Sequence, residues 1–127
     1  MHTVTMTETE IMRYITLRMI EMGVPAHLSG YTYLREAILL SGYDMSIVGS
    51  VTKLLYPEIA RIYRTSPSKV ERSIRNAIEI SWNRGKLEVF DKLFGYSRDS
   101  GVGRPTNSEY IARVADHIRL ELLTVCS

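Results

Sequence analysis

The sequence predicts an all-α protein, a compact bundle of about six helices that contains a helix-turn-helix. Apolar residues recur at helical spacing along most of the chain, and short segments with glycine, proline or hydroxyl-bearing residues separate these stretches. No stretch alternates apolar and polar residues as a half-buried strand does. With 127 residues and 45% hydrophobic side chains, the chain can build one core, so we expect one domain over residues 8–127. Residues 1–7 show no periodicity and are expected to be a disordered leader or a remnant of the start site.

The composition excludes several classes of protein. Sixteen basic and 14 acidic residues give a net charge of +2, too small for a non-specific polycation but compatible with one basic face. The single cysteine, Cys126, allows neither a disulfide framework nor a cysteine-rich metal site. No apolar run approaches the roughly 20 residues that cross a bilayer, and the N-terminus does not resemble a signal peptide. We therefore expect a cytoplasmic protein with no cofactor, no metal and no membrane contact.

The first two helices are defined by periodicity and by stop signals. Apolar residues at helical spacing predict a helix that begins at Thr7 or Thr9 and ends at Met22, just before a glycine. A second helix is expected over residues 31–40, because a serine-glycine pair follows at 41–42.

A third helical stretch, residues 50–63, contains a proline. Pro57 lacks a backbone donor and would clash with the preceding turn, so we expect a break or a fresh start near Tyr56 and Pro57. The apolar side chains expected to face inward are Val51, Leu54, Leu55, Ile59, Ile62 and Tyr63.

The longest predicted helix follows a turn rich in hydroxyl groups and runs to Gly85 without glycine or proline, which gives about five turns. Its start has two interpretations. Ser66 can cap a helix whose first residue is Pro67, or Ser68 can form a capping box with Glu71.

After this helix we expect a short helix, a loop and a final helix. The short helix covers residues 87–93, and the loop, residues 97–105, is expected to be exposed and mobile because it contains two glycines. Hydroxyl and amide caps at residues 106–108 start the last helix, which continues to about Leu123.

The helix after Pro67 has two faces of different chemistry. Because consecutive residues turn by about 100°, aliphatic side chains fall on one seam and polar side chains fall on an opposite stripe. Arginine can donate two hydrogen bonds to guanine, asparagine can pair with adenine, and glutamate can accept from cytosine. The seam consists of Val70, Ile74, Ala77, Ile78 and Ser81, and the stripe consists of Ser68, Arg72, Arg75, Asn76 and Glu79, flanked by Lys69 and Glu71.

The order of the elements also favours DNA binding. A short helix at residues 57–63, a turn and a capped longer helix form the order of a helix-turn-helix, whose second helix enters the major groove. Lys53, Arg61 and Arg64 add positive charge around this unit and can approach phosphates.

The polar stripe also has an ordinary explanation. A solvated helix face commonly carries i,i+4 pairs such as Arg72 with Asn76 or Arg75 with Glu79, which only aid solubility. The stripe has no aromatic side chain on which an unpaired base could stack, so duplex DNA is favoured over RNA.

The residues also resemble a known family, the C-terminal effector domain of stage-zero sporulation protein A, the response regulator that governs endospore formation in Gram-positive bacteria. The likeness covers roughly residues 11–120. The matching blocks are Gly23-Val24-Pro25-Ala26-His27, Tyr33-Leu34-Arg35-Glu36-Ala37-Ile38, Leu55-Tyr56-Pro57-Glu58-Ile59-Ala60, Val70-Glu71-Arg72 with Ile74-Arg75, Leu93-Phe94-Gly95-Tyr96, and Pro105-Thr106-Asn107-Ser108-Glu109.

The resemblance implies a six-helix domain whose third and fourth helices form the helix-turn-helix and which binds a short DNA element often found in tandem copies. It also implies that residues 85–98 lie in the surface that engages the RNA polymerase sigma factor. Taken with the stripe, it makes Glu71, Arg72, Arg75 and Asn76 the expected base-reading residues. The expected backbone or flanking contacts are Ser50, Lys53, Ser66, Ser68, Lys69 and Glu79.

The sequence departs from the family pattern at three places. Asn76 stands where the family commonly has histidine, Lys69 where it often has arginine, and the loop at 97–104 differs. The first departure bears on fine sequence preference. The family's phosphorylatable receiver domain does not precede the effector within these 127 residues, either because this is a fragment or because it is a stand-alone relative, so phosphorylation control is not expected within this chain.

Two other classes of function compete with DNA binding. A helical protein-protein interaction module without DNA binding would use exposed aromatic anchors, taken from Tyr31, Tyr33, Tyr43, Phe90, Phe94 and Tyr96. An enzyme would need a site assembled from His2, His27, Asp116, His117 and Cys126, which lie on separate elements without ligand spacing. We therefore expect no enzyme but a transcription regulator, an activator or a repressor, that is a monomer when free. The sequence leaves open whether two copies touch on DNA.

Overall fold

The structure, a computed structural model, describes residues 6–126, with side chains as far as residue 124. Within this range there is no strand, and the chain forms six α-helices, which confirms the predicted all-α class. They are α1 (Glu8–Glu21), α2 (Ser29–Tyr43), α3 (Tyr56–Tyr63), α4 (Pro67–Arg84), α5 (Leu87–Phe94) and α6 (Asn107–Cys126).

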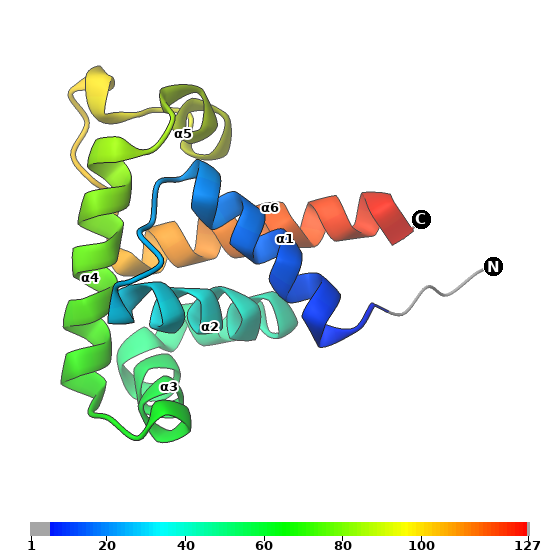
Figure 1. Cartoon of the computed structure of the whole chain (residues 1–127), viewed down its shortest axis with the longest axis vertical. Coiled ribbons are helices and arrows are strands. Elements are labelled where there is room, and N and C mark those ends of the chain that lie inside the picture. The colour runs from blue at the N-terminus through cyan, green and yellow to red at the C-terminus, as the bar shows by residue number, and fades with distance from the viewer. Residues whose placement is uncertain (1–5, 127) are drawn as a thin grey trace.

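The helices are arranged around α4. Figure 1 shows α4 upright along one edge of the molecule, with α1, α2 and α6 extending away from it, α3 at one end of it and α5 at the other. The most extensive contacts between helices join α2 to α4 and α2 to α6. The helix that carries the polar stripe is therefore backed by the rest of the bundle along its length.

The predicted first helix is confirmed, and it is tied to the last one. Thr7 caps α1, because its hydroxyl accepts a hydrogen bond from the Glu10 backbone N–H at 3.2 Å. The Arg18 guanidinium donates to Glu21 at 2.6 Å and to Glu121 of α6 at 2.8 Å. These hydrogen bonds raise the pKa of Arg18, although partial burial acts against them.

The break predicted near Tyr56 and Pro57 is confirmed, but two inward-facing predictions were wrong. Residues 45–50 form a 3-10 helix and residues 51–55 a π-helix, and α3 starts afresh at Tyr56. Leu54 and Ile62 are 54% and 39% exposed. The prediction assumed one α-helical period across the whole stretch, whereas the wider winding of the π-helix and the fresh start change which residues share a face.

The second helix is longer than predicted at both ends. It begins at Ser29 and continues through Gly42 to Tyr43, where Asp44 adopts an extended conformation and its side chain accepts from the Ser46 N–H at 3.0 Å. Gly42 lies within the helix and does not have positive φ, so a glycine in this sequence position is not by itself a stop signal.

The aliphatic seam predicted for the long helix is confirmed. Val70, Ile74, Ala77, Ile78 and Ser81 are all fully buried. The helix α2 packs against α4 and approaches it very closely at Gly30. A Cβ at that position would lie 2.1 Å from the backbone oxygen of Ser73. The first turn of α2 can reach α4 only because residue 30 has no side chain.

The polar member of the seam is satisfied inside the core. The Ser81 hydroxyl donates to the Met22 carbonyl at 2.6 Å, and it lies 2.6 Å from the Tyr110 hydroxyl. Since the single hydroxyl hydrogen of Ser81 goes to the carbonyl, Tyr110 donates to Ser81. Burial raises the pKa of the Tyr110 phenol, which keeps it protonated as a donor. This network joins the end of α1, α4 and α6.

The helical geometry also bears on membranes. Of the helices within residues 6–126, none combines the length and the apolar character needed to cross a membrane.

Gly30→Ala is expected to lower the free energy of unfolding by about 1–3 kcal/mol, because the added methyl group forces α2 and α4 apart. Gly42→Ala is the matched control in the same helix. Nothing lies within 4 Å of a Cβ at residue 42, so this change is expected to raise the free energy of unfolding by about 0.5–1 kcal/mol. Urea denaturation followed by circular dichroism measures both, and equal effects of the two substitutions would contradict the close packing.

Candidate nucleic-acid interface

The turn between α3 and α4 is tight. Arg64 ends α3 in the left-handed conformation with φ of 54°, and the Thr65 N–H donates to the Ala60 carbonyl at 2.9 Å. A left-handed residue with a side chain costs roughly 1–2 kcal/mol. The chain accepts this strain because the turn redirects it within three residues, from Arg64 to Ser66, so that α4 follows α3 as in a helix-turn-helix.

Of the two predicted starts of the long helix, the earlier one is correct. The Ser66 hydroxyl accepts from the Lys69 backbone N–H at 3.1 Å, and Pro67 is the first helical residue. Proline suits this position, because its φ is already helical and its missing N–H would have had no partner in the helix. Ser68 therefore lies inside the first turn, with its side chain exposed.

The predicted polar stripe lies on the outside of α4. The seam faces the bundle, while the side chains of the opposite face project into solvent, with Glu71 half-buried at its edge. The exposed members are Ser68, Lys69, Arg72, Arg75, Asn76 and Glu79. The residues predicted for the stripe and its flanks therefore share one accessible face.

Two arginines of this face differ in their surroundings. Arg75 donates to Glu71, one turn earlier, at 2.7 Å, and the partner is not Glu79 as the solubility hypothesis suggested. Across residues 6–126, Arg72 makes no hydrogen bond or ion pair. One guanidinium is thus held in place by a carboxylate, and the other is unengaged.

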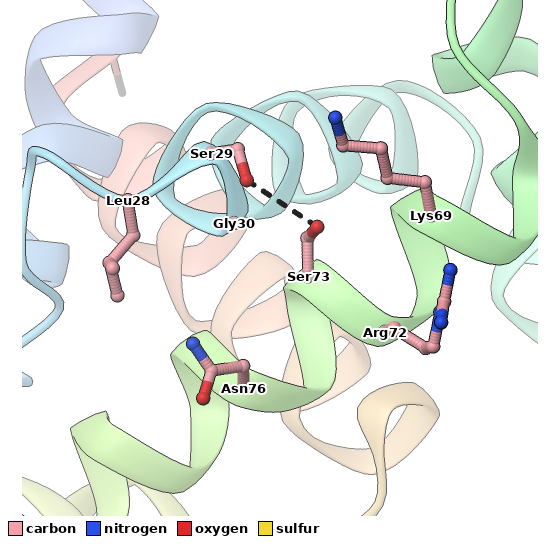
Figure 2. Close-up of a pocket in the computed structure, with 7 residues that line it drawn as sticks. All are labelled: Leu28, Ser29, Gly30, Lys69, Arg72, Ser73 and Asn76. Atoms are coloured by element: carbon pink, nitrogen blue, oxygen red, sulfur yellow. Dashed lines mark hydrogen bonds between the residues drawn. The ribbon is translucent and has the colours of Figure 1, made fainter.

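A hollow of about 260 Å³ lies on one flank of α4, where the first turn of α2 meets it. Figure 2 shows Lys69, Arg72 and Asn76 on α4 beside Ser29 and the backbone of Gly30 on α2. The hydroxyls of Ser29 and Ser73 lie 3.4 Å apart and link the two helices. The two cations are the only charged side chains that line this hollow among the described residues.

The start of α6 secures the other flank of α4. The Asn107 amide donates to the Tyr56 hydroxyl of α3 at 3.0 Å and to the Glu71 carbonyl of α4 at 3.3 Å. One side chain therefore fixes α3 relative to α4. Burial raises the pKa of Tyr56, so its phenol stays protonated and can donate in turn.

Thr106 and Glu109 form a capping box at this end of α6. The Thr106 hydroxyl accepts from the Glu109 N–H, and the Glu109 carboxylate accepts from the Thr106 N–H, both at 3.2 Å. These hydrogen bonds lower the pKa of Glu109. The capping box and the Asn107 hydrogen bonds lie side by side and join the start of α6 to α3 and α4.

A family model described as sporulation initiation factor Spo0A C terminal matches residues 15–118, most of the chain. The chain belongs to the Spo0A C-terminal family. This is a family of DNA-binding effector domains of a sporulation regulator and not a family of enzymes. The resemblance noted from the sequence blocks is confirmed, as is the six-helix fold that it implied.

The remaining predicted residues lie close to this unit. In this member of the Spo0A C-terminal family, Lys53 is exposed and Ser50 half-buried, both in the irregular segment ahead of α3. Arg61 donates to Glu58 at 2.6 Å, and this hydrogen bond lowers the pKa of the Glu58 carboxyl. The positive charge of Arg61 is therefore locally neutralised. Lys53 is therefore the better placed of these two cations to meet an anion.

The aromatic anchors of the alternative hypothesis are mostly in the core. Tyr31, Tyr33, Phe90 and Phe94 are buried, and Trp82 packs edge-on against Phe90 at a centroid distance of 5.0 Å. Of the six aromatic residues considered, Tyr43 is exposed and Tyr96 is partly buried. The aromatic residues are thus accounted for mainly by packing.

The residues considered for catalysis are dispersed. His27 and Asp116 are exposed on different elements, and His117 lies 2.9 Å from Glu121 on its own helix. Within the described part of the chain, no group of three or more histidine, cysteine or acidic side chains could hold a metal ion. His2 and the Cys126 side chain lie outside the described residues.

The sequence did not reveal the groups that position the candidate interface. Asn107 was considered only as a helix cap, and nothing in the local pattern indicated its bonds to α3 and α4, which are distant in sequence. The loop at 97–105 was expected to be exposed throughout, but Ser97 and Pro105 are buried. The two glycines suggested an open loop, whereas the buried Ser97 and Pro105 anchor its two ends.

Ser66→Ala is expected to lower the free energy of unfolding by about 1 kcal/mol, because the first turn of α4 loses its cap. Ser68→Ala is the matched control, and it is expected to change stability by less than about 0.5 kcal/mol, since it removes an exposed hydroxyl. Thermal denaturation of the two variants measures the difference. A larger loss for Ser68→Ala would favour the later start of the helix.

Proposed function

We propose that this chain is a sequence-specific, double-stranded DNA-binding domain of a transcription regulator, with α4 as the helix that enters the major groove. The observation that carries the proposal is the exposed face of α4, where Arg72, Arg75 and Asn76 project from a helix whose other face is sealed in the core. A helix about 10–12 Å across fits a major groove about 12 Å wide.

The side chains of this face match the donors and acceptors of base edges. An arginine can donate two parallel hydrogen bonds to guanine, and Asn76 can pair with adenine. Glu71 can accept from cytosine, provided that it leaves Arg75. The Glu71–Arg75 pair is partly exposed, and such pairs contribute little to stability, so exchanging it for base contacts costs little.

Backbone contacts are proposed for residues around this face. The Ser66 hydroxyl uses its lone pair for the helix cap and keeps its hydrogen free to donate to a phosphate. Lys69 and Ser68 lie in the same first turn, and Lys53 lies ahead of α3. Ser50 and Glu79 complete the proposed flanking set, although the charge of Glu79 suits a base amino group and not a phosphate.

The wider regulatory role is proposed from the family. Residues 85–98 would engage the RNA polymerase sigma factor, and the DNA site would occur in tandem copies occupied by a protein that is a monomer when free. The support is spatial: α5 lies at the opposite end of α4 from α3, and its Glu88, Asp91 and Lys92 are exposed (Figure 1). Activation or repression then depends on where the site lies in a promoter. We also propose that the domain has no catalytic activity and acts in the cytoplasm.

Arg72→Ala and Arg75→Ala are each expected to cost about 1–3 kcal/mol of specific binding, because each removes a bidentate contact to a base. The helical content and the melting temperature should be unchanged, since both side chains are outside the core. A duplex selected from a random pool, titrated beside a scrambled duplex, measures the loss. Arg13→Ala, on the exposed side of α1, is the control.

Wild-type binding to any duplex is expected to weaken steeply as salt rises, because each neutralised phosphate releases a counterion. Titrations at several salt concentrations test this. A protein-protein interaction module would bind neither the selected nor the scrambled duplex at any salt concentration, and that result would remove the proposed function.

A further inference from the structure

The loop between α5 and α6 is attached to α4 at two points. Near its beginning, Arg98 donates to the Gly85 carbonyl at 2.8 Å and to the Trp82 carbonyl at 3.3 Å, at the C-terminal end of α4. Near its end, the Arg104 guanidinium lies 3.4 Å from the Arg75 carbonyl. Figure 1 shows the loop running beside α4 between these levels. Residues 75 and 85 are about 15 Å apart along a helix, so the loop follows α4 over this length. Its second attachment places Arg104 next to Arg75, a residue of the exposed face.

Arg104 lines a hollow of about 340 Å³ on this flank of α4. Arg75, Thr52 and Ser108 also line this hollow, and each carries a side chain that can donate hydrogen bonds. Within residues 6–126, Glu71 is the only acidic residue that lines it, and its carboxylate is already bonded to Arg75. Among the described residues Arg104 has no carboxylate partner, and its side chain is exposed. The hollow therefore presents hydrogen-bond donors and an uncompensated positive charge.

The hollow on the opposite flank, with Lys69 and Arg72, has the same character. The exposed face of α4 thus lies between two cationic depressions, one against α2 and the other against the start of α6. A helix in the major groove has a sugar-phosphate strand along each side. Two cationic hollows, one on each side of the exposed face, match the two strands of phosphates. A helix face that is merely solvated requires no positive charge on either side.

We propose that Arg104 binds a backbone phosphate of duplex DNA, on the strand opposite to the one that Lys69 faces. This inference rests on the proposed function, since it requires α4 to lie in the major groove. The bond to the Arg75 carbonyl uses one guanidinium nitrogen and leaves the other donors for phosphate oxygens. The contact is independent of sequence and fixes the depth and tilt of α4, so Arg104 is a backbone-binding residue and not a base-reading one.

The test compares Arg104→Gln with wild type on the selected duplex and on its scrambled counterpart, at a series of salt concentrations. Loss of one phosphate contact is expected to reduce the slope of log affinity against log salt by about 0.9. Over a fourfold rise in salt, wild-type affinity therefore falls about 3.5-fold more than that of the variant. Both duplexes should weaken by the same factor at low salt, because no base contact is lost.

Two further variants control for charge and for folding. Arg119→Gln removes one exposed arginine from α6 at a distance from α4 and is expected to leave both affinity and slope unchanged. Arg104→Lys keeps the charge and is expected to keep the wild-type slope. Circular dichroism melts verify that each variant is folded. If the bond from Arg104 to the Arg75 carbonyl had only a structural role, Arg104→Gln would lower the melting temperature and leave the salt slope unchanged.

The outcomes separate the two proposals. If wild type shows no salt-dependent binding to either duplex, the proposed function itself is wrong. If wild type binds and Arg104→Gln keeps the full slope, or if Arg119→Gln lowers the slope equally, the phosphate contact is overturned while DNA binding stands. A loss confined to the selected duplex would instead make Arg104 a base-reading residue and overturn the inference as stated.

Discussion

The burial of one face of α4 is the constraint on which the rest of this structure depends. Val70, Ile74, Ala77 and Ile78 are fully removed from solvent. At about 1.5–3 kcal/mol for each large aliphatic side chain, this seam is enough to fix both the position and the rotation of the helix. The rotation of α4 about its own axis matters most, because the orientation that buries Ile74 also directs Arg72 and Arg75 outwards. The proposed interface is thus a by-product of packing on the opposite side of one helix.

The sequence predicted this helix well because the information is local. The seam and the stripe repeat at helical spacing, and caps and glycines mark the ends, so Ser66, Pro67 and Gly85 identified the element within two residues. The family likeness added the order of the motifs, and residues 15–118 match the family model. Fold class, helix-turn-helix and exposed arginines were therefore all accessible without coordinates.

The errors arose where contacts are distant in sequence or where the period changes. Leu54 was placed inside by extending an α-helical period through a segment that winds as a π-helix. Asn107 and Arg104 gave no signal, because their partners on α3 and α4 lie about 30 to 50 residues away. The need for glycine at residue 30 was likewise invisible, since it comes from the backbone of Ser73 in another helix. Local patterns define elements, and only assembly shows what holds them together.

The small polar network in the core has a consequence for how this molecule comes apart. The Ser81 hydroxyl, the Met22 carbonyl and the Tyr110 hydroxyl come from three separate segments and satisfy one another away from water. If any one segment detaches, the remaining groups lose a partner in a dry environment, which is costly. Intermediates with α1 or α6 loosened are therefore disfavoured, and unfolding should proceed as a single cooperative event that leaves no half-assembled species exposed to proteases.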